Sequence, residues 1–196
     1  MARLLASTGF VQEQAALHRM LDEFNEDILL LVHGLLFELT PLHTEYLAAF
    51  YEEEFDKPDD PLASSQKRAM IPRQRIRAYL SRIAPEGLDP STGVEVMRTI
   101  QKIYSGFVHG ASPHIMEMYG GVPPKWHVRG MTGTTRADDH SNDLWNVFYR
   151  SIASFAVTAK AFGDDKLFGS IMKYMKEFAT AAGEDFSRPP PRVNRK

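Results

Sequence analysis

Hydrophobic side chains recur at intervals of three and four residues along most of the chain, whereas the alternation expected of a β-strand is weak. This spacing predicts amphipathic helices separated by turns that contain proline and glycine. The expected helices cover residues 12–39, 41–55, 72–83, 94–109, 113–119, 139–162 and 164–183. We therefore predict an all-α fold in which five or six of these helices form a bundle, as a single domain over residues 1–183.

The two longest of these helices each carry a stripe of apolar residues that we expect to face the core. In the first helix the stripe consists of Leu17, Leu21, Phe24, Ile28, Val32, Leu35 and Leu39. In the later helix it consists of Leu144, Phe148, Ile152, Phe155, Ala159 and Phe162.

Two segments lack helical periodicity. Residues 120–137 form the longest irregular loop, with a short hairpin expected around residues 126–131, and loops of this length are usually functional or mobile. We expect Asp138 or Asp139 to cap the helix that follows, and Asp164 to cap the last one. Residues 184–196 are basic and rich in proline, which predicts a disordered tail.

Composition removes several classes of function. The chain contains no cysteine, which excludes disulfides, thiolate catalysis and cysteine-ligated metals and fits a reducing cytoplasm. No apolar run approaches the roughly 20 residues that a membrane span needs, and no secretion signal precedes the first helix. We therefore expect a cytoplasmic protein without membrane contact. Phosphate-binding loops of nucleotide hydrolases and the nucleophile elbow of serine hydrolases are both absent.

The net charge of −2 conceals an asymmetry along the chain. Residues 1–60 contain 13 acidic and 3 basic side chains, a balance of −10, and residues 61–196 contain 12 acidic and 20 basic ones, a balance of +8. We favour the interpretation that the two sets complement each other within the fold or a dimer. The alternative is that they steer a polyanion to one side of the molecule.

The helix over residues 94–109 combines a core face with a cationic face. Arg98, Lys102, Ser105 and His109 lie opposite the apolar residues Val96, Met97, Ile100, Ile103, Tyr104, Phe107 and Val108. If this cationic face binds a ligand, additional candidates for contact with it are Trp126, His127 and Arg129 in the loop and Asn146 and Arg150 on the later helix.

This set of side chains suits a polyanion such as RNA. Arginine and lysine hold phosphates, histidine transfers protons near neutral pH, and an aromatic ring stacks on a base. Catalysis by such a set would need no cofactor. Two alternatives stay open: the face is merely solvated, or it is a homodimer seam or the docking surface of a protein partner.

A divalent metal site is the alternative enzymatic interpretation. His114 and Glu117 are three residues apart, as are His140 and Asp143, so that two helices of a bundle could each supply two ligands. The order of residues is the reverse of the Glu-x-x-His pattern of di-iron bundles, and no HExxH motif is present.

The segment Tyr104-Ser105-Gly106-Phe107-Val108-His109-Gly110 resembles the helix-ending S-x-x-V-H-G signature of HEPN-like bacterial helical proteins. The resemblance implies a helical bundle that often dimerises, and we expect this chain to form a homodimer. It also implies metal-independent ribonuclease activity in toxin–antitoxin or phage-defence systems, in which an arginine precedes a histidine by four to six intervening residues. His109 would be the catalytic histidine, but the positions allowed for the arginine hold Lys102, Ile103 and Tyr104. An active ribonuclease with Lys102 in that role and a non-catalytic binding protein both remain open.

Overall fold

The computed structural model describes residues 1–52, 54–57, 59–66, 68–83 and 90–183. Their helices are α1 (Ala2–Thr8), α2 (Val11–Leu36), α3 (Pro41–Tyr51), α4 (Arg73–Ile83), α5 (Pro90–Val108), α6 (Ser112–Met116), α7 (Thr135–Ala161) and α8 (Asp165–Ala181), with a 3-10 turn at Pro61–Ala63. The strands β1 (Tyr119–Gly120) and β2 (Lys125–Trp126) form a small antiparallel hairpin. The all-α prediction is confirmed, and α1 is a helix that the periodicity did not predict. The predicted tail at residues 184–196 lies outside the described residues.

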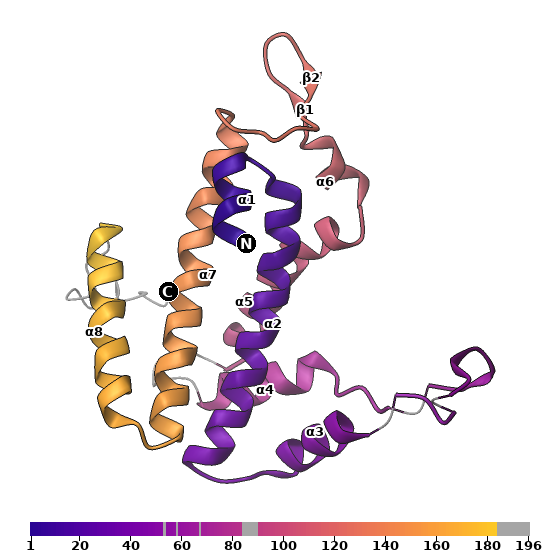
Figure 1. Cartoon of the computed structure of the whole chain (residues 1–196), viewed down its shortest axis with the longest axis vertical. Coiled ribbons are helices and arrows are strands. Elements are labelled where there is room, and N and C mark those ends of the chain that lie inside the picture. The colour runs from indigo at the N-terminus through magenta and orange to yellow at the C-terminus, as the bar shows by residue number, and fades with distance from the viewer. Residues whose placement is uncertain (53, 58, 67, 84–89, 184–196) are drawn as a thin grey trace, which may run out of the picture.

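Two long helices, α2 and α7, lie side by side at the centre of the molecule (Figure 1). α1 packs on both of them, α5 and α4 pack on α2 and on each other, and α8 lies on the outer side of α7. α3 and the β1–β2 hairpin project from opposite ends (Figure 1). No helix among the described residues is both long and apolar enough to cross a membrane.

The helix ends follow local rules of capping. Asp164 caps α8 as predicted, since its carboxylate accepts a hydrogen bond of 2.8 Å from the Leu167 amide. The predicted cap of α7 was wrong, because the helix begins four residues earlier and is capped by the Thr134 hydroxyl, which accepts from the Ala137 amide. This extra turn shortens the irregular segment that we expected to reach residue 137, and the hairpin within it pairs Tyr119 with Trp126 instead of spanning residues 126–131.

The end of this segment is anchored to the turn between α1 and α2. The Met131 amide donates to the Gly9 carbonyl oxygen at 2.8 Å, and the Met131 side chain is buried. Gly9 has a φ of +74°, and a Cβ there would collide with backbone nitrogens, that of Met131 at 2.6 Å. Glycine is therefore required at this position both for conformation and for space.

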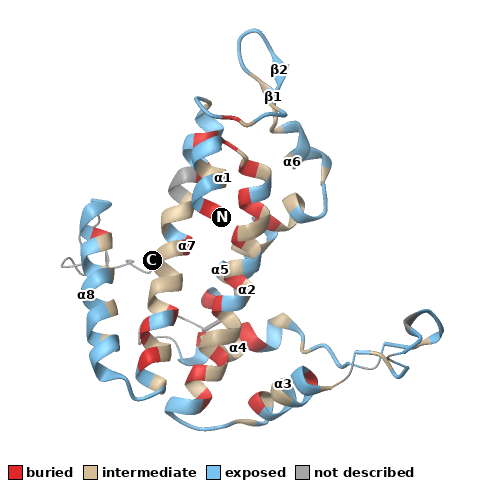
Figure 2. Cartoon of the chain, viewed as in Figure 1, coloured by how far each residue is buried: buried red, intermediate tan, exposed pale blue. Residues whose placement is uncertain are grey.

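Polar side chains make up much of the buried face of α2, which contradicts part of the predicted core stripe, although Val32 of that stripe is buried as predicted. Gln14, His18, Asp22 and Asn25 are at most 8% exposed, whereas Phe24 is 53% exposed. Figure 2 shows buried residues along the length of α2. Leu35 and Leu39, also members of the predicted stripe, are exposed as well. This polar face packs on α7, where Gln14 Nε2 donates to the His140 carbonyl oxygen at 2.6 Å and Asn25 Nδ2 donates to the Ser151 hydroxyl oxygen at 3.2 Å.

The stripes predicted for the two other helices are also only partly buried. On α7, Phe155 and Phe162 are exposed, while Val147 and Ser154 are buried. On α5, Tyr104 is buried, whereas Val96, Ile103 and Val108 are each about half exposed. The described residues thus bury fewer large apolar side chains than the sequence pattern predicts.

Ion pairs join the acidic N-terminal helices to the basic remainder of the chain, which confirms the favoured interpretation of the charge asymmetry. Asp27 on α2 pairs with Arg73 on α4, and Glu26 accepts from Arg77 Nε at 2.7 Å. Because Glu26 and Arg77 are largely buried, removing either one would strand a charge in the interior. The pairs hold α4 against α2 (Figure 1).

Candidate functional site

An arginine and a histidine from different helices meet at the surface where α5 ends. His109 is the residue after the last turn of α5; its amide donates to the Ser105 carbonyl oxygen at 3.1 Å, and it is exposed. The guanidinium of Arg19, on α2, lies 3.0 Å from the Ser105 hydroxyl oxygen and 3.4 Å from His109 Nε2, both measured from Nη1. An arginine can only donate, so the second contact uses His109 Nε2 as an acceptor in the neutral imidazole.

The Glu23 carboxylate, which itself accepts a hydrogen bond from an amide, contacts the Arg19 guanidinium at its Nε edge. Glu23 lies one turn further along α2 and its Oε1 is 3.4 Å from Arg19 Nε. The same oxygen accepts a 2.7 Å hydrogen bond from the Gln101 side chain on α5. Because Nε is engaged by Glu23, the Nη1 end of the guanidinium is turned toward Ser105 and His109. Such orientation suits a residue that must receive an anion.

The cationic row on α5 is exposed, as predicted. Lys102 is exposed, and Arg98 makes a surface ion pair of 3.6 Å with Glu95 in which both side chains are more than half exposed. Such a pair contributes little to stability and exchanges readily with other anions. Arg98, Lys102 and His109 recur at four- and seven-residue spacings, so they lie along one side of the helix.

The loop candidates lie around the hairpin, beyond α6 (Figure 1). Trp126 packs on Tyr119 with ring centroids 5.3 Å apart, and His127 Nε2 is 3.3 Å from the Gly120 carbonyl oxygen. Arg129 is exposed. These contacts hold the hairpin together and do not bring the three side chains to Arg19.

The two candidates on α7 differ in their surroundings. Asn146 is exposed. Arg150 Nη1 is 2.6 Å from Asp22 Oδ1, and the Asp22 side chain is nearly buried, so this arginine serves the interface between α2 and α7.

The four metal candidates come together only in part. His140 Nε2 is 4.0 Å from Glu117 Oε2, and the other oxygen of Glu117 pairs with Arg136 at 3.2 Å. His114 and His140 each pack edge-on against the Phe107 ring. Asp143 is hydrogen-bonded to Tyr104. Within the described part of the chain, no group of three or more His, Asp or Glu side chains could hold a metal ion.

A buried polar cluster between α2, α5 and α7 is the feature that the sequence prediction missed. His18 is fully buried, packs edge-on against the Tyr104 ring at 5.5 Å, and lies near His140 and Asp143. Burial lowers the pKa of His18 to about 4 against the opposing effect of Asp143, and burial also lowers the pKa of His140. Both imidazoles are therefore neutral at pH 7.

Burial also shifts the acids of this cluster. Burial raises the pKa of Asp22, an effect that the Arg150 guanidinium opposes. Burial raises the pKa of Tyr104 as well, and the charge of the neighbouring Asp143 raises it further. The i, i+4, i+8 spacing of Gln14, His18 and Asp22 was the available signal in the sequence. The cluster lies in the interior and not at the surface occupied by Arg19 and His109.

Comparisons of the chain with protein-family models, with curated proteins and with solved structures found no match. The resemblance to HEPN-like proteins therefore stays a prediction, and the function is argued from the geometry of the site.

Proposed function

We propose that the exposed face formed by α5 and Arg19 binds RNA through its phosphate groups. The observation that carries the proposal is the meeting of the Arg19 guanidinium with His109, 3.4 Å apart at the surface. The sequence of α5 has lysine and not arginine ahead of this histidine. Arg19 supplies from α2 the planar, permanently charged group that Lys102 cannot replace.

The arrangement supports phosphate binding over a merely solvated face. Arg19 is held by Glu23 with its Nη1 end next to Ser105, so a phosphate can be received without first ordering a flexible side chain. Lys102 and Arg98 continue the positive charge along α5 and would contact the neighbouring phosphates of a strand. RNA is the polyanion that the HEPN-like resemblance implies.

His109 would add proton transfer to this binding. Once the Arg19 guanidinium has moved from His109 Nε2 to the phosphate, the neutral imidazole can take the proton of a ribose 2′-hydroxyl at Nε2 while that oxygen attacks the adjacent phosphorus. The bond from phosphorus to the 5′ oxygen breaks, and water protonates that oxygen and regains a proton from the imidazolium. Arg19 would stabilise the charge that develops on the phosphate. This chemistry needs no metal ion and would make the protein a ribonuclease of a toxin–antitoxin or defence system in the bacterial cytoplasm. Without the proton transfer, the same face would serve an RNA-binding protein.

Binding is tested by fluorescence anisotropy with a labelled single-stranded RNA at 50 and 200 mM salt. Three phosphate contacts predict a fall in affinity of roughly 20-fold over this range, because each contact releases counterions. Arg19→Ala and Lys102→Ala should each weaken binding and reduce the salt dependence. Lys173→Ala is the matched control, since Lys173 is an exposed cation on α8 and its removal changes the net charge equally. Absent binding, or binding that Lys173→Ala weakens as much as Lys102→Ala, would refute the proposal.

Catalysis is tested separately by following cleavage of the same RNA in the presence of EDTA. We expect cleavage by the wild type and its loss in His109→Ala, with RNA affinity reduced less than in Arg19→Ala. A His109→Ala protein that cleaves at the wild-type rate would remove the histidine from the mechanism. RNA binding without cleavage by the wild type would leave the binding function alone.

A further inference from the structure

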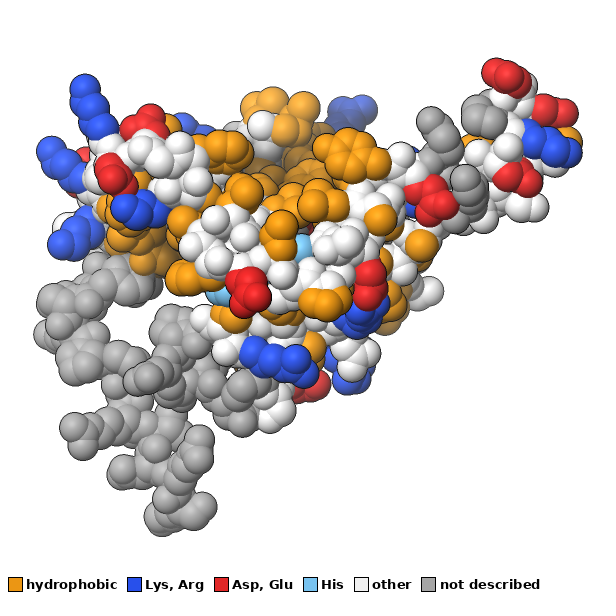
Figure 3. Space-filling view, turned by 90° about the horizontal axis from the view of Figure 1, so that it is seen from below, with side chains coloured by type: hydrophobic (Ala, Val, Ile, Leu, Met, Phe, Trp, Pro, Cys, Tyr) orange, Lys and Arg blue, Asp and Glu red, His pale blue; other side chains and the backbone are white. Residues whose placement is uncertain are grey.

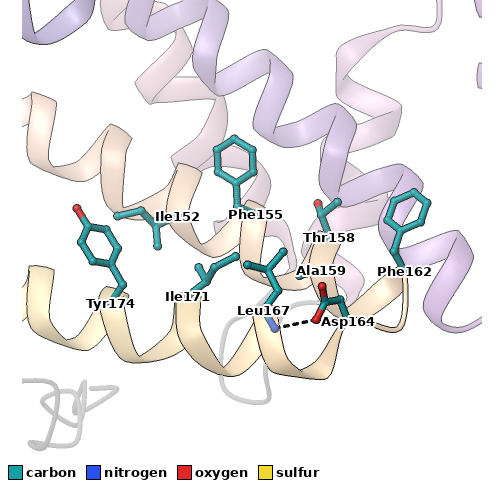
Figure 4. A pocket seen from close by; sticks show the side chains of 9 residues that line it. All are labelled: Ile152, Phe155, Thr158, Ala159, Phe162, Asp164, Leu167, Ile171 and Tyr174. Carbon is teal, nitrogen blue, oxygen red and sulfur yellow. Dashed lines mark hydrogen bonds between the residues drawn. The ribbon is translucent and has the colours of Figure 1, made fainter.

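We infer that the groove between α7 and α8 is the contact surface for a second copy of this chain. The groove has a volume of about 490 Å³ and is lined almost entirely by apolar side chains from both helices (Figure 4). It lies away from Arg19 and His109, so the inference does not depend on the proposed function.

Large side chains along the groove are exposed to solvent in the single chain. Phe155 is 63% and Phe162 is 77% exposed on α7, and Tyr174 is 55% and Leu167 is 48% exposed on α8. Figure 4 shows Leu167 and Ile171 of α8 facing Ile152 and Ala159 of α7 across the groove. The charged side chain in its lining, Asp164, is engaged in capping α8. The surface therefore offers no charge pattern that would select a charged partner.

The apolar surface continues at the end of the molecule where α2 and α7 stop and α8 begins (Figure 1). Phe37, just after α2, is 73% exposed and Leu35 is 60% exposed. Hydrophobic side chains gather on this end of the molecule in the space-filling view (Figure 3). Single exposed apolar residues are ordinary, but a monomer rarely exposes a joined patch beyond a few hundred Å².

The exposed aromatic area is a large part of what a stable dimer needs. Taking roughly 200 Å² for a whole aromatic side chain, the exposed fractions of Phe37, Phe155, Phe162 and Tyr174 correspond to about 540 Å². This is two-thirds of the roughly 800 Å² that each partner contributes to an interface of standard size, before the leucines are added.

A second copy fits this surface because the surface contains both protrusions and a hollow. Under a two-fold axis, the exposed phenylalanines of one copy can enter the groove of the other, and the same contact is made in return. α8 is packed on α7 along one side, and pairing the two copies would complete a four-helix arrangement of α7 and α8 with their equivalents. The dimer seam would then lie on α7 and α8, leaving the cationic face of α5 open.

The test measures molecular mass by sedimentation equilibrium between 1 and 100 μM. We expect the wild type to have twice the 22.2 kDa of the chain, and Phe155→Ser to raise the dimer dissociation constant by about 30-fold or more, as expected for a central interface aromatic. Phe50→Ser is the matched control, since Phe50 on α3 is also 63% exposed but lies outside the groove. Circular dichroism verifies folding, and Tyr174→Ser replaces Phe155→Ser if that variant unfolds.

Three results would overturn the inference. A wild-type protein that is monomeric at 100 μM would show that no second copy binds this surface. A dimer that dissociates in Phe50→Ser and not in Phe155→Ser or Tyr174→Ser has its seam elsewhere. A monomer that sediments with phosphatidylcholine vesicles in a Phe155-dependent manner uses the groove for lipid instead.

Discussion

Acid should destabilise this protein through the buried His18, and the size of the effect follows from its surroundings. Burial lowers the pKa of His18 from 6.5 to about 4, with Asp143 raising it and His140 and Arg150 lowering it further. The unfolded chain therefore binds a proton near pH 6.5, while the folded protein does not until about pH 4. Stability is lost as the pH falls through this window.

The magnitude comes from the difference between the two pKa values. At about 1.36 kcal/mol per unit, His18 alone should reduce the free energy of unfolding by roughly 3 kcal/mol between pH 7 and pH 4. Burial of Asp22 and Glu26 acts in the opposite direction, because it raises their pKa values and favours the folded state as they become protonated. The contribution of His18 must therefore be isolated from these carboxyl groups.

Urea unfolding of the wild type and His18→Gln at several pH values between 7.5 and 4 provides this isolation. Glutamine does not titrate and can occupy a similar polar site. His18→Gln should be less stable than the wild type at pH 7.5, and the difference should shift in favour of the variant by about 3 kcal/mol at pH 4. Equal pH dependence of the two proteins would show that His18 is not buried in its neutral form.

Two further variants test the packing. Arg77→Met should reduce the free energy of unfolding by about 3 kcal/mol or more, because it leaves the buried Glu26 carboxylate without its partner. In the same urea titration Arg75→Met, which removes one partner of an exposed ion pair, should have a much smaller effect. Equal effects of the two variants would contradict the burial of α4 against α2. Gly9→Ala should lower the melting temperature far more than Gly163→Ala. Both glycines have a positive φ, but of these two only Gly9 lies where the added methyl group would collide with neighbouring backbone atoms. Similar losses would mean that the loop ending at Met131 is not anchored on Gly9.

Helical periodicity identified the elements of this protein better than it identified their buried faces. The breaks at Pro41 and Gly163 fall where the sequence predicts them, because proline and glycine constrain the backbone locally. Which face of α2 is buried depends on its neighbours. The helix has both an apolar stripe and a polar one, and α5 and α7 offer Tyr104 and Arg150 to the polar stripe. The periodicity within a single helix does not determine which of its two stripes is buried.

The candidate site was predictable in its α5 half and not in its α2 half. The exposure of Lys102 and His109 follows from their position opposite the apolar side of one helix. Arg19 is 90 residues earlier in the chain and reaches His109 only because α2 packs on α5. Its neighbour Glu23 gave no local signal either, since a Glu four residues after an Arg on a helix is usually a surface pair.

The association of RNA with Arg19 and His109 is tested most directly by a nuclear magnetic resonance titration of the ¹⁵N-labelled protein with a short single-stranded RNA. The arginine side-chain Nε signal of Arg19 and the backbone amides from Lys102 to Gly110 should shift, and Arg19→Lys should weaken the binding that the shifts report. Shifts confined to α3 or α8, or no shifts at saturating RNA, would contradict the account.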